Sequence, residues 1–334
     1  MAESYSSEDK LAGFDLMQTN YKTVDEHAIR ADLIIPQKAG SGKRPVIVHF
    51  HGGGLVTGDS LFMDWVPRWL LELAKRYGAV IVSPNYRLLP EVTSLDLFAD
   101  VDDFWTWLHS STPATVLAAH STPTELDLDR VLMAGGSAGG LLSISLALSH
   151  PDEVRAATAA YPMIDLNSAD YNEKRAVPPL GTDVSESVVR KYLAAVEDGS
   201  SPVISSAMLP TRIDLMIGLF THAMYKEEVY ERGIEGSGSP RREVRYPFER
   251  LDQPGVKVPR GGIVILHGRQ DSVVPIGGSE RFVTKARKVF AGQPGGDRIV
   301  LAAREGEHGF DTDVAWDTNW VKEALEAAVQ AWLE

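Results

Sequence analysis

Short apolar runs alternate with helical patterns along most of the chain. Residues 28–35, 46–50 and 79–83 are rich in Val, Ile and Leu and predict strands; the last two are apolar enough to be buried on both faces of a sheet. Residues 65–77 place apolar side chains at helical spacing and stop at Gly78, which suits the left-handed position after a helix end. The pattern therefore predicts strands joined by helices.

The alternation continues, is interrupted once, and then returns. The interruption runs from residue 164 to about 259; it is mostly helical and contains a stretch rich in Gly, Ser, Pro and Arg at 233–242. A long interruption of a β/α repeat is more often a functional insertion than a structureless loop. The remaining predicted strands are 130–134, 155–161, 262–266 and 299–302, and the remaining predicted helices are 95–108, 138–149, 188–196, 213–230, 280–290 and 314–333.

Strands separated by crossover helices require a mostly parallel sheet with helices on both faces. We therefore predict an α/β fold. The length of 334 residues, with 44% hydrophobic and 24% charged residues, fits one large globular domain, or one domain plus a lid.

Composition removes several classes of function. With 33 Lys and Arg against 46 Asp and Glu the formal charge is −13, which would repel nucleic acid and anionic bilayers, so we expect neither as a partner. The absence of cysteine excludes disulfides, thiolate metal sites and a cysteine nucleophile. No segment approaches the roughly 20 apolar residues of a membrane span, and residues 1–10 lack a signal-peptide pattern, so a cytoplasmic location is expected. The sequence leaves a homodimer open.

The strongest chemical signal is Gly135-Gly136-Ser137-Ala138-Gly139-Gly140, placed between a predicted strand and a predicted helix. This is the context of a nucleophile elbow, in which a tight turn flanked by small residues lifts a serine hydroxyl above the sheet. Neither G-x-G-x-x-G nor a P-loop pattern can be laid over these residues, which argues against a phosphate loop. We predict that Ser137 is a nucleophile and that Ala138 contributes a backbone amide to an oxyanion hole.

A second signal, His51-Gly52-Gly53-Gly54, directly follows the buried strand 46–50. Glycines let backbone amides approach a developing oxyanion, so Gly53 and Gly54 are the further predicted donors, with Gly52 in support. His51 is expected to hold this loop by hydrogen bonding. His49 and His51 form H-x-H, but no H-E-x-x-H pattern and no thiolate accompany them, so we predict no metal.

A serine nucleophile needs a histidine base, and the histidine needs a carboxylate. In the elbow architecture the chain order is Ser, acid, His. Asp271 follows closely on the buried strand 262–266, and His308 follows the last predicted strand between glycines. We therefore predict the triad Ser137, Asp271 and His308. The carboxylates of Glu307, Asp311 and Asp313 are rivals, and His150, His222 and His267 are interpreted as structural.

These residues together resemble the α/β-hydrolase superfamily and, within it, the hormone-sensitive-lipase-like esterases. The matching elements follow the family order from about residue 45 onwards: His51-Gly52-Gly53-Gly54, Tyr86-Arg87-Leu88-Leu89-Pro90-Glu91, residues 135–140, Asp271 and His308-Gly309-Phe310. Two positions depart from the family. Gly136 stands where the family usually has an acidic residue or threonine, and Asp271-Ser272-Val273-Val274-Pro275 is closer to dienelactone-hydrolase or peptidase-like relatives.

The resemblance implies a catalytic domain over residues 21–164 and 259–334 and a helical cap over 1–20 and 165–258. It also implies a serine carboxylic ester hydrolase without cofactor. Because residues 209–230 are strongly apolar, we expect small to medium, mostly apolar esters. Relatives of this fold also serve as lyases, cyclases, acyltransferases or receptors, and these alternatives stay open because fold alone does not determine function.

Overall fold

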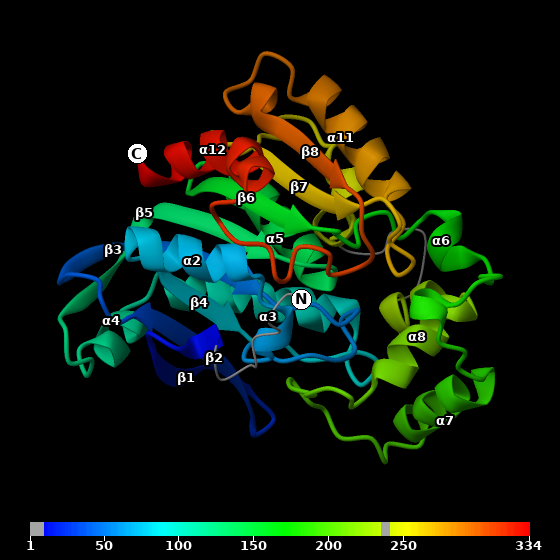
Figure 1. Ribbon diagram of the computed structural model, residues 1–334. Helices are drawn as coiled ribbons and strands as arrows, with labels where there is room; N and C mark the ends of the chain where they lie inside the picture. The colour runs from blue at the N-terminus through cyan, green and yellow to red at the C-terminus, as the bar shows by residue number, and fades with distance from the viewer. Residues whose placement is uncertain (1–9, 235–240) are drawn as a thin grey trace.

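The computed structural model describes residues 10–234 and 241–334 and contains an eight-stranded sheet (Figure 1). The strand order is β1-β2-β4-β3-β5-β6-β7-β8; β2 pairs antiparallel with β1 and β4, and all other pairs are parallel. The predicted mostly parallel sheet is confirmed. The strands are β1 (Phe14–Val24), β2 (His27–Pro36), β3 (Gly42–Phe50), β4 (Val80–Pro84), β5 (Thr124–Gly135), β6 (Val154–Ala160), β7 (Ile263–Gly268) and β8 (Ile299–Arg304).

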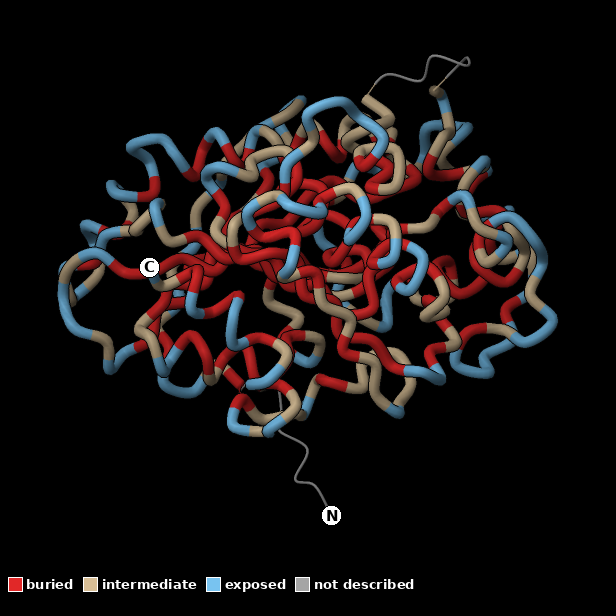
Figure 2. The backbone as a smooth tube through the Cα atoms, turned by 90° about the horizontal axis from the view of Figure 1, so that it is seen from above, coloured by how far each residue is buried: buried red, intermediate tan, exposed pale blue. Residues whose placement is uncertain are grey.

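Helices cover both faces of the sheet. On one face, α2 (Arg68–Tyr77) and α12 (Asn319–Leu333) pack against the strands, and on the other α3 (Ser94–Leu108), α5 (Ala138–Ser149) and α11 (Gly277–Val289) do so. Figure 2 shows buried backbone concentrated along the middle of the molecule, between the two helical layers. Short elements complete these layers: η1 (Met63–Trp65), α4 (Thr112–Leu117) and η4 (Gly296–Arg298).

The central strands bury side chains on both faces. Ile47 of β3 and Ile81 of β4 belong to the cluster under α2 and α12, whereas Val46, Val48 and Val82 belong to the cluster on the opposite face. Side chains of successive strand residues point to opposite faces, so a strand covered on both sides needs an unbroken apolar run. This requirement explains why the runs 46–50 and 79–83 were recognisable in the sequence.

The prediction that residues 14–20 belong to a cap is wrong. They form part of β1, which pairs antiparallel with β2 from Phe14–Pro36 to Val24–His27. β1 is an edge strand, and its half-buried positions include Asp15 and Thr19, so apolar and polar side chains do not alternate cleanly along it. Residues 10–13 lead into this strand, and the Lys10 ammonium donates to the Val66 carbonyl at 2.9 Å. The rest of that prediction, residues 1–9, lies outside the described residues.

The insertion between β6 and β7 lies largely beyond the carboxyl ends of the strands, where Figure 1 shows α6, α7 and α8 grouped together. The predicted helix 213–230 is broken at Ala223, whose φ of 58° is incompatible with a continuing right-handed helix. Two late helices, α9 and α10, pack instead on α3 and α5 beside the sheet. The elements are α6 (Ala169–Asn172), η2 (Pro179–Gly181), α7 (Glu186–Glu197), α8 (Ile213–Thr221), η3 (Lys226–Tyr230), α9 (Arg242–Arg245) and α10 (Pro247–Arg250).

The helix predicted from residue 65 begins at Arg68. Val66 and Pro67 are extended, because a residue that precedes proline is sterically disfavoured in the helical region. Trp65 therefore lies in the separate turn η1, between the glycine loop and α2. The helix ends as predicted, with Gly78 left-handed at a φ of 64°.

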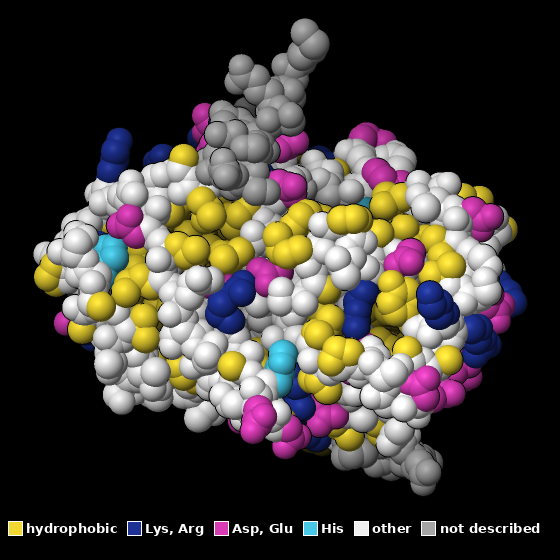
Figure 3. All heavy atoms as spheres, turned by 90° about the horizontal axis from the view of Figure 1, so that it is seen from below, with side chains coloured by type: hydrophobic (Ala, Val, Ile, Leu, Met, Phe, Trp, Pro, Cys, Tyr) yellow, Lys and Arg dark blue, Asp and Glu magenta, His cyan; other side chains and the backbone are white. Residues whose placement is uncertain are grey.

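The surface shown in Figure 3 mixes acidic, basic and apolar side chains. Among the helices of the described segments, none combines the length and the apolar character that a membrane crossing requires.

Candidate active site

Ser137 lies at the turn between β5 and α5 with φ 56° and ψ −119°, a strained backbone position. The turn is tight: a Cβ on Gly139 would lie 2.0 Å from the Phe50 carbonyl oxygen, and one on Gly135 would lie 2.4 Å from the Gly139 carbonyl oxygen. The Ser137 amide donates to the Ala160 carbonyl at 2.9 Å and so ties the turn to β6. The predicted elbow geometry is therefore present, and glycine is required on both sides of it.

Asp271 and His308 meet on neighbouring loops that follow β7 and β8. His308 Nδ1 lies 2.8 Å from Asp271 Oδ2, and Asp271 Oδ1 accepts from the amides of Val273 at 2.9 Å and Val274 at 2.7 Å. A carboxylate only accepts, so it selects the tautomer in which Nδ1 carries the proton. The lone pair of His308 Nε2 is then available on the other edge of the ring.

Asp271 is held in its ionised form. Burial alone would raise its pKa, but hydrogen bonds from His267 and His308, together with the Val274 amide, outweigh burial and lower the pKa to about 2. His267 lies beside the pair: its Nε2 is 2.8 Å from the Val274 carbonyl and 3.5 Å from Asp271 Oδ2. The sequence reading of His267 as structural agrees with its burial, but it also contacts the candidate acid.

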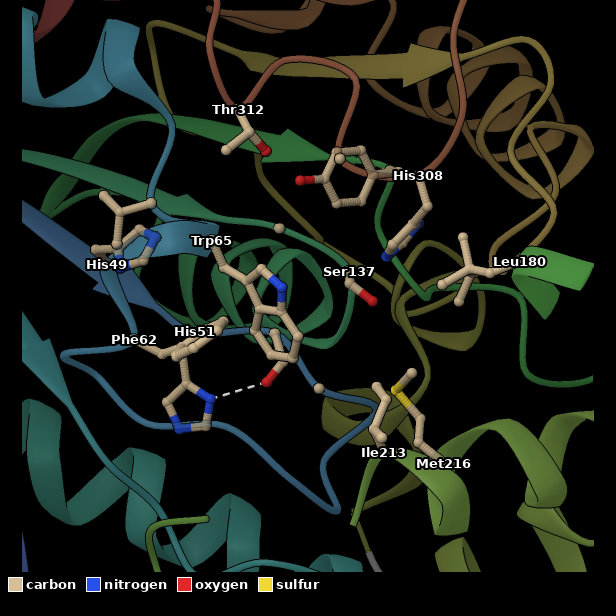
Figure 4. A pocket seen from close by; sticks show the side chains of 17 residues that line it. His49, His51, Phe62, Trp65, Ser137, Leu180, Ile213, Met216, His308 and Thr312 are labelled. Carbon is tan, nitrogen blue, oxygen red and sulfur yellow. Dashed lines mark hydrogen bonds between the residues drawn. The ribbon is translucent and has the colours of Figure 1, made fainter. Parts of the chain in front are cut away.

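Ser137 and His308 line one cavity of about 300 Å³. Figure 4 shows the Ser137 hydroxyl and the His308 ring facing this cavity together. Among the described residues, the His308 ring has a hydrogen bond to Asp271 and none to Ser137. The cavity is lined by His49, His51, Gly52, Gly53, Phe62, Trp65, Val66, Gly136, Ser137, Tyr161, Leu180, Ile213, Met216, Val273, His308, Gly309 and Thr312.

The glycine loop borders the same cavity. Gly53 has a φ of 100° and its carbonyl accepts from Val56 and Thr57, and a Cβ there would lie 2.1 Å from the Thr57 carbonyl oxygen. Within the described residues, the amides of Gly53, Gly54 and Ala138 donate to no other group. Gly52 and Gly53 line the cavity, whereas Gly54 and Ala138 are not lining residues.

The insertion holds the glycine loop from outside. Tyr225 donates its hydroxyl proton to the Gly54 carbonyl at 2.8 Å, and Thr57 donates to the Thr211 carbonyl at 2.7 Å. Arg212 lies 3.0 Å from Glu91 Oε2, which belongs to the Tyr86–Glu91 motif, and both side chains are buried. The loop and the insertion therefore form one hydrogen-bonded unit.

Two histidines of the H-x-H pattern have separate structural roles. His51 Nδ1 lies 2.8 Å from the Gly52 carbonyl, and its ring stacks on Tyr86 at 4.4 Å, whereas His49 Nδ1 lies 3.4 Å from Ser83 Oγ. Burial lowers the pKa of His51 to about 4 and that of His49 to about 3, so both are neutral at pH 7. Across the described residues, no group of three His, Asp or Glu side chains forms a metal-binding cluster.

Among the described residues, none of the rival carboxylates forms a hydrogen bond with the His308 ring. Asp311 is buried and accepts from Trp69 Nε1 at 2.9 Å, and burial raises its pKa. Asp313 is exposed. Glu307 Oε1 accepts from the amides of Ser272 at 2.6 Å and His308 at 2.8 Å, so it joins the loop of Asp271 to the loop of His308.

Tyr161 is a site residue that sequence reasoning missed. It has a φ of 37°, lines the cavity, and places its ring centroid 4.3 Å from that of His308. Its ring also lies 3.2 Å from where a Cβ on Gly136 would stand, which explains glycine at this family-divergent position. The available signal was its location at the carboxyl end of the predicted strand 155–161. Phe62, Trp65 and Thr312 carried no comparable signal.

Known proteins resemble the chain along nearly its whole length. A family model described as the alpha/beta hydrolase fold matches residues 47–218. The probable carboxylesterase M8 of a Phoma species is 30% identical, covering 98% of this chain and 99% of its own. The non-reducing polyketide synthase Preu6 of Preussia isomera is 27% identical over 95% of this chain, which corresponds to 15% of the synthase.

Solved structures agree on the fold. The crystal structure of esterase LipW from Mycobacterium marinum superposes with a TM-score of 0.59 at 17% identity, covering 98% of this chain and 86% of that one. The family model and the near-complete match to the Phoma protein show that the chain belongs to the α/β-hydrolase fold family, in its hormone-sensitive-lipase-like branch.

We expect Tyr225→Phe to destabilise the protein by about 1 to 3 kcal/mol, because it leaves the buried Gly54 carbonyl without its donor. Urea unfolding measures the change. Tyr192→Phe is the matched control, since the Tyr192 hydroxyl contacts Asp214 on the outer part of the same insertion. Equal stability of the two variants would contradict a structural role for the Tyr225–Gly54 bond.

The depressed pKa of Asp271 predicts a specific loss of stability in acid. The ionised form is stabilised in the folded state, so its contribution is present above the unfolded pKa near 4 and is lost as the pH falls toward 2. We expect the stability difference between wild type and Asp271→Asn to shrink by about 2 kcal/mol between pH 5 and pH 2. Denaturant titrations of both proteins test this, and a difference that does not vary with pH would refute it.

Proposed function

We propose that this protein is a serine carboxylic ester hydrolase in which Ser137, His308 and Asp271 form the catalytic triad. The observation that carries the proposal is the 2.8 Å contact between His308 Nδ1 and Asp271 Oδ2 at the edge of a cavity that also exposes Ser137. The name of the Phoma relative, a probable carboxylesterase, supports the same reaction class.

The residues suit acyl transfer to serine. His308 Nε2 takes the Ser137 proton as the oxygen attacks the ester carbonyl, and Asp271 stabilises the resulting imidazolium. The amides of Gly53, Gly54 and Ala138 are the proposed oxyanion donors, since they have no partner among the described residues. His308 then protonates the departing alcohol, and water releases the acid by the reverse steps.

The insertion supplies the proposed cap. Leu180, Ile213 and Met216 of the insertion line the cavity, so this wall is apolar. Most of the other apolar residues of 209–230 are buried in the main core, among them Leu215, Leu219, Phe220, Tyr225 and Val229. The segment therefore serves mainly as core, and a few of its residues support binding of a largely apolar ester.

A second candidate is transfer of the acyl group to an acceptor other than water. The match to a segment of a non-reducing polyketide synthase favours it. Both reactions share the acyl-enzyme, so product analysis separates them: hydrolysis yields free acid, and transfer yields a new ester or amide only when an acceptor is added. The location in the cytoplasm and the homodimer stay predictions from the sequence.

We expect an organophosphonate to label Ser137 stoichiometrically and a short-chain nitrophenyl ester to be hydrolysed. Both reactions should vanish in Ser137→Ala, because the variant lacks the hydroxyl that would form the acyl-enzyme. Ser143→Ala, a buried serine of α5, is the control for effects on folding. Full turnover by Ser137→Ala would remove the nucleophile assignment.

Asp271→Asn should lower kcat on the order of 10⁴-fold while the protein stays folded, because an amide favours the wrong histidine tautomer. Steady-state kinetics and circular dichroism give the two readouts. A loss of only a few-fold would transfer the role to another carboxylate.

Glu307 is expected to position His308 rather than to react. Glu307→Ala removes the acceptor that joins Ser272 to His308 and should reduce kcat more than it changes KM, whereas Glu307→Gln keeps an acceptor oxygen and should retain most activity. Glu326→Ala is the control, since Glu326 is exposed on α12 and forms no hydrogen bond or ion pair within the described residues. Equal effects of the Ala and Gln variants would argue against positioning through this oxygen.

A further inference from the structure

Trp65 carries a hydrogen-bond donor that faces the cavity. The residue lies in η1 and lines the cavity together with Phe62, whose ring packs edge-on at 4.9 Å. Figure 4 shows the indole nitrogen on the edge of the ring that is turned toward Ser137. Within residues 10–234 and 241–334, no atom accepts a hydrogen bond from this nitrogen.

The two sides of the cavity differ in chemistry. Figure 4 shows Leu180, Ile213 and Met216 on one side of Ser137, where they form an apolar wall. On the other side it shows Trp65, Phe62 and Thr312, which offer an N–H and a hydroxyl group beside an aromatic ring.

The Trp65 indole differs from the hydroxyl groups of the lining. The hydroxyls of Tyr161 and Thr312 can each donate and accept a hydrogen bond, so they can pair with one another or with water. The indole N–H can only donate and has no acceptor among the described residues, so a ligand beside it can supply one.

An unpaired donor in an aromatic-walled cavity discriminates between ligands. A hydrocarbon group placed against Trp65 would displace water and leave the N–H unsatisfied, whereas an oxygen atom would accept its hydrogen bond. Sites built to hydrogen-bond a ligand reject the analogue that lacks the matching group.

We propose that Trp65 is a specificity-determining residue, and that the substrate carries an ether, ketone or hydroxyl oxygen in the part that lies next to it. This inference rests on the proposed ester hydrolysis at Ser137 and narrows its substrate class. The preferred esters are oxygen-bearing rather than plain alkyl esters.

Two isosteric substrate pairs test the inference. Ethyl 3-methoxypropanoate against ethyl pentanoate places the oxygen in the acyl group, and 2-methoxyethyl acetate against butyl acetate places it in the alcohol. For each pair, the ratio of kcat/KM values is measured in wild type and in Trp65→Phe. The intrinsic reactivities of the two esters cancel when the ratios of the two enzymes are compared. The smaller ring of Trp65→Phe affects both isosteric esters alike, so its effect cancels within the ratio.

We expect the preference for the ether to fall about 3- to 10-fold in Trp65→Phe for one pair, which identifies the side of the ester that meets Trp65. Phe62→Leu alters the same wall without removing a donor and should leave both ratios unchanged. Unaltered ratios in Trp65→Phe for both pairs would overturn the inference while leaving ester hydrolysis intact. Absence of turnover and of phosphonate labelling in wild type would instead defeat the proposed function.

A binding measurement tests the inference without substrate turnover. In Ser137→Ala protein labelled with ¹⁵N, the Trp65 indole resonance is assigned by its loss in the Ser137→Ala, Trp65→Phe double variant. We expect this resonance to move on addition of the ether ester of the responsive pair and to move less with its carbon isostere. Equal shifts with both esters would overturn the role of the N–H as a specificity donor.

Discussion

The close approach of the β5–α5 turn to the end of β3 is the constraint on which the site depends. Gly139 lies so near the Phe50 carbonyl that any side chain there would collide with backbone. This contact sets Ser137 beside the glycine loop that continues β3, and the parallel order of β5, β6, β7 and β8 then brings the loops of Asp271 and His308 to the same edge. Local glycine chemistry and sheet topology together assemble three segments far apart in sequence.

Features recorded in local sequence could be predicted. The strands of the sheet centre are continuous apolar runs, α5 begins and ends where its pattern does, and the elbow, the acid and the histidine each follow a strand end. Parallel topology requires those strand ends to share one edge, so the pairing of Asp271 with His308 followed from chain order. The sequence therefore contained the fold class and the residues that meet at the site.

Features set by tertiary contacts could not be predicted. β1 is half solvated and has no clean alternation, so its pairing with β2 was hidden. The break at Ala223 and the positive φ of Tyr161 reflect packing around them rather than their own propensities. Trp65 lies in η1 rather than in α2 because the extended Val66 and Pro67 separate the two, a consequence that periodicity does not reveal.

Two hydrogen bonds, from Tyr225 and Thr57, and the buried Arg212–Glu91 ion pair tie the glycine loop and the segment after it to the insertion. Exchanging this insertion for another would therefore change the position of the amides near Gly53 together with the wall of the cavity. An insertion that lacks Tyr225 and Arg212 would leave the Gly54 carbonyl and the Glu91 carboxylate without these partners. The position of the glycine loop would then change together with the wall of the cavity.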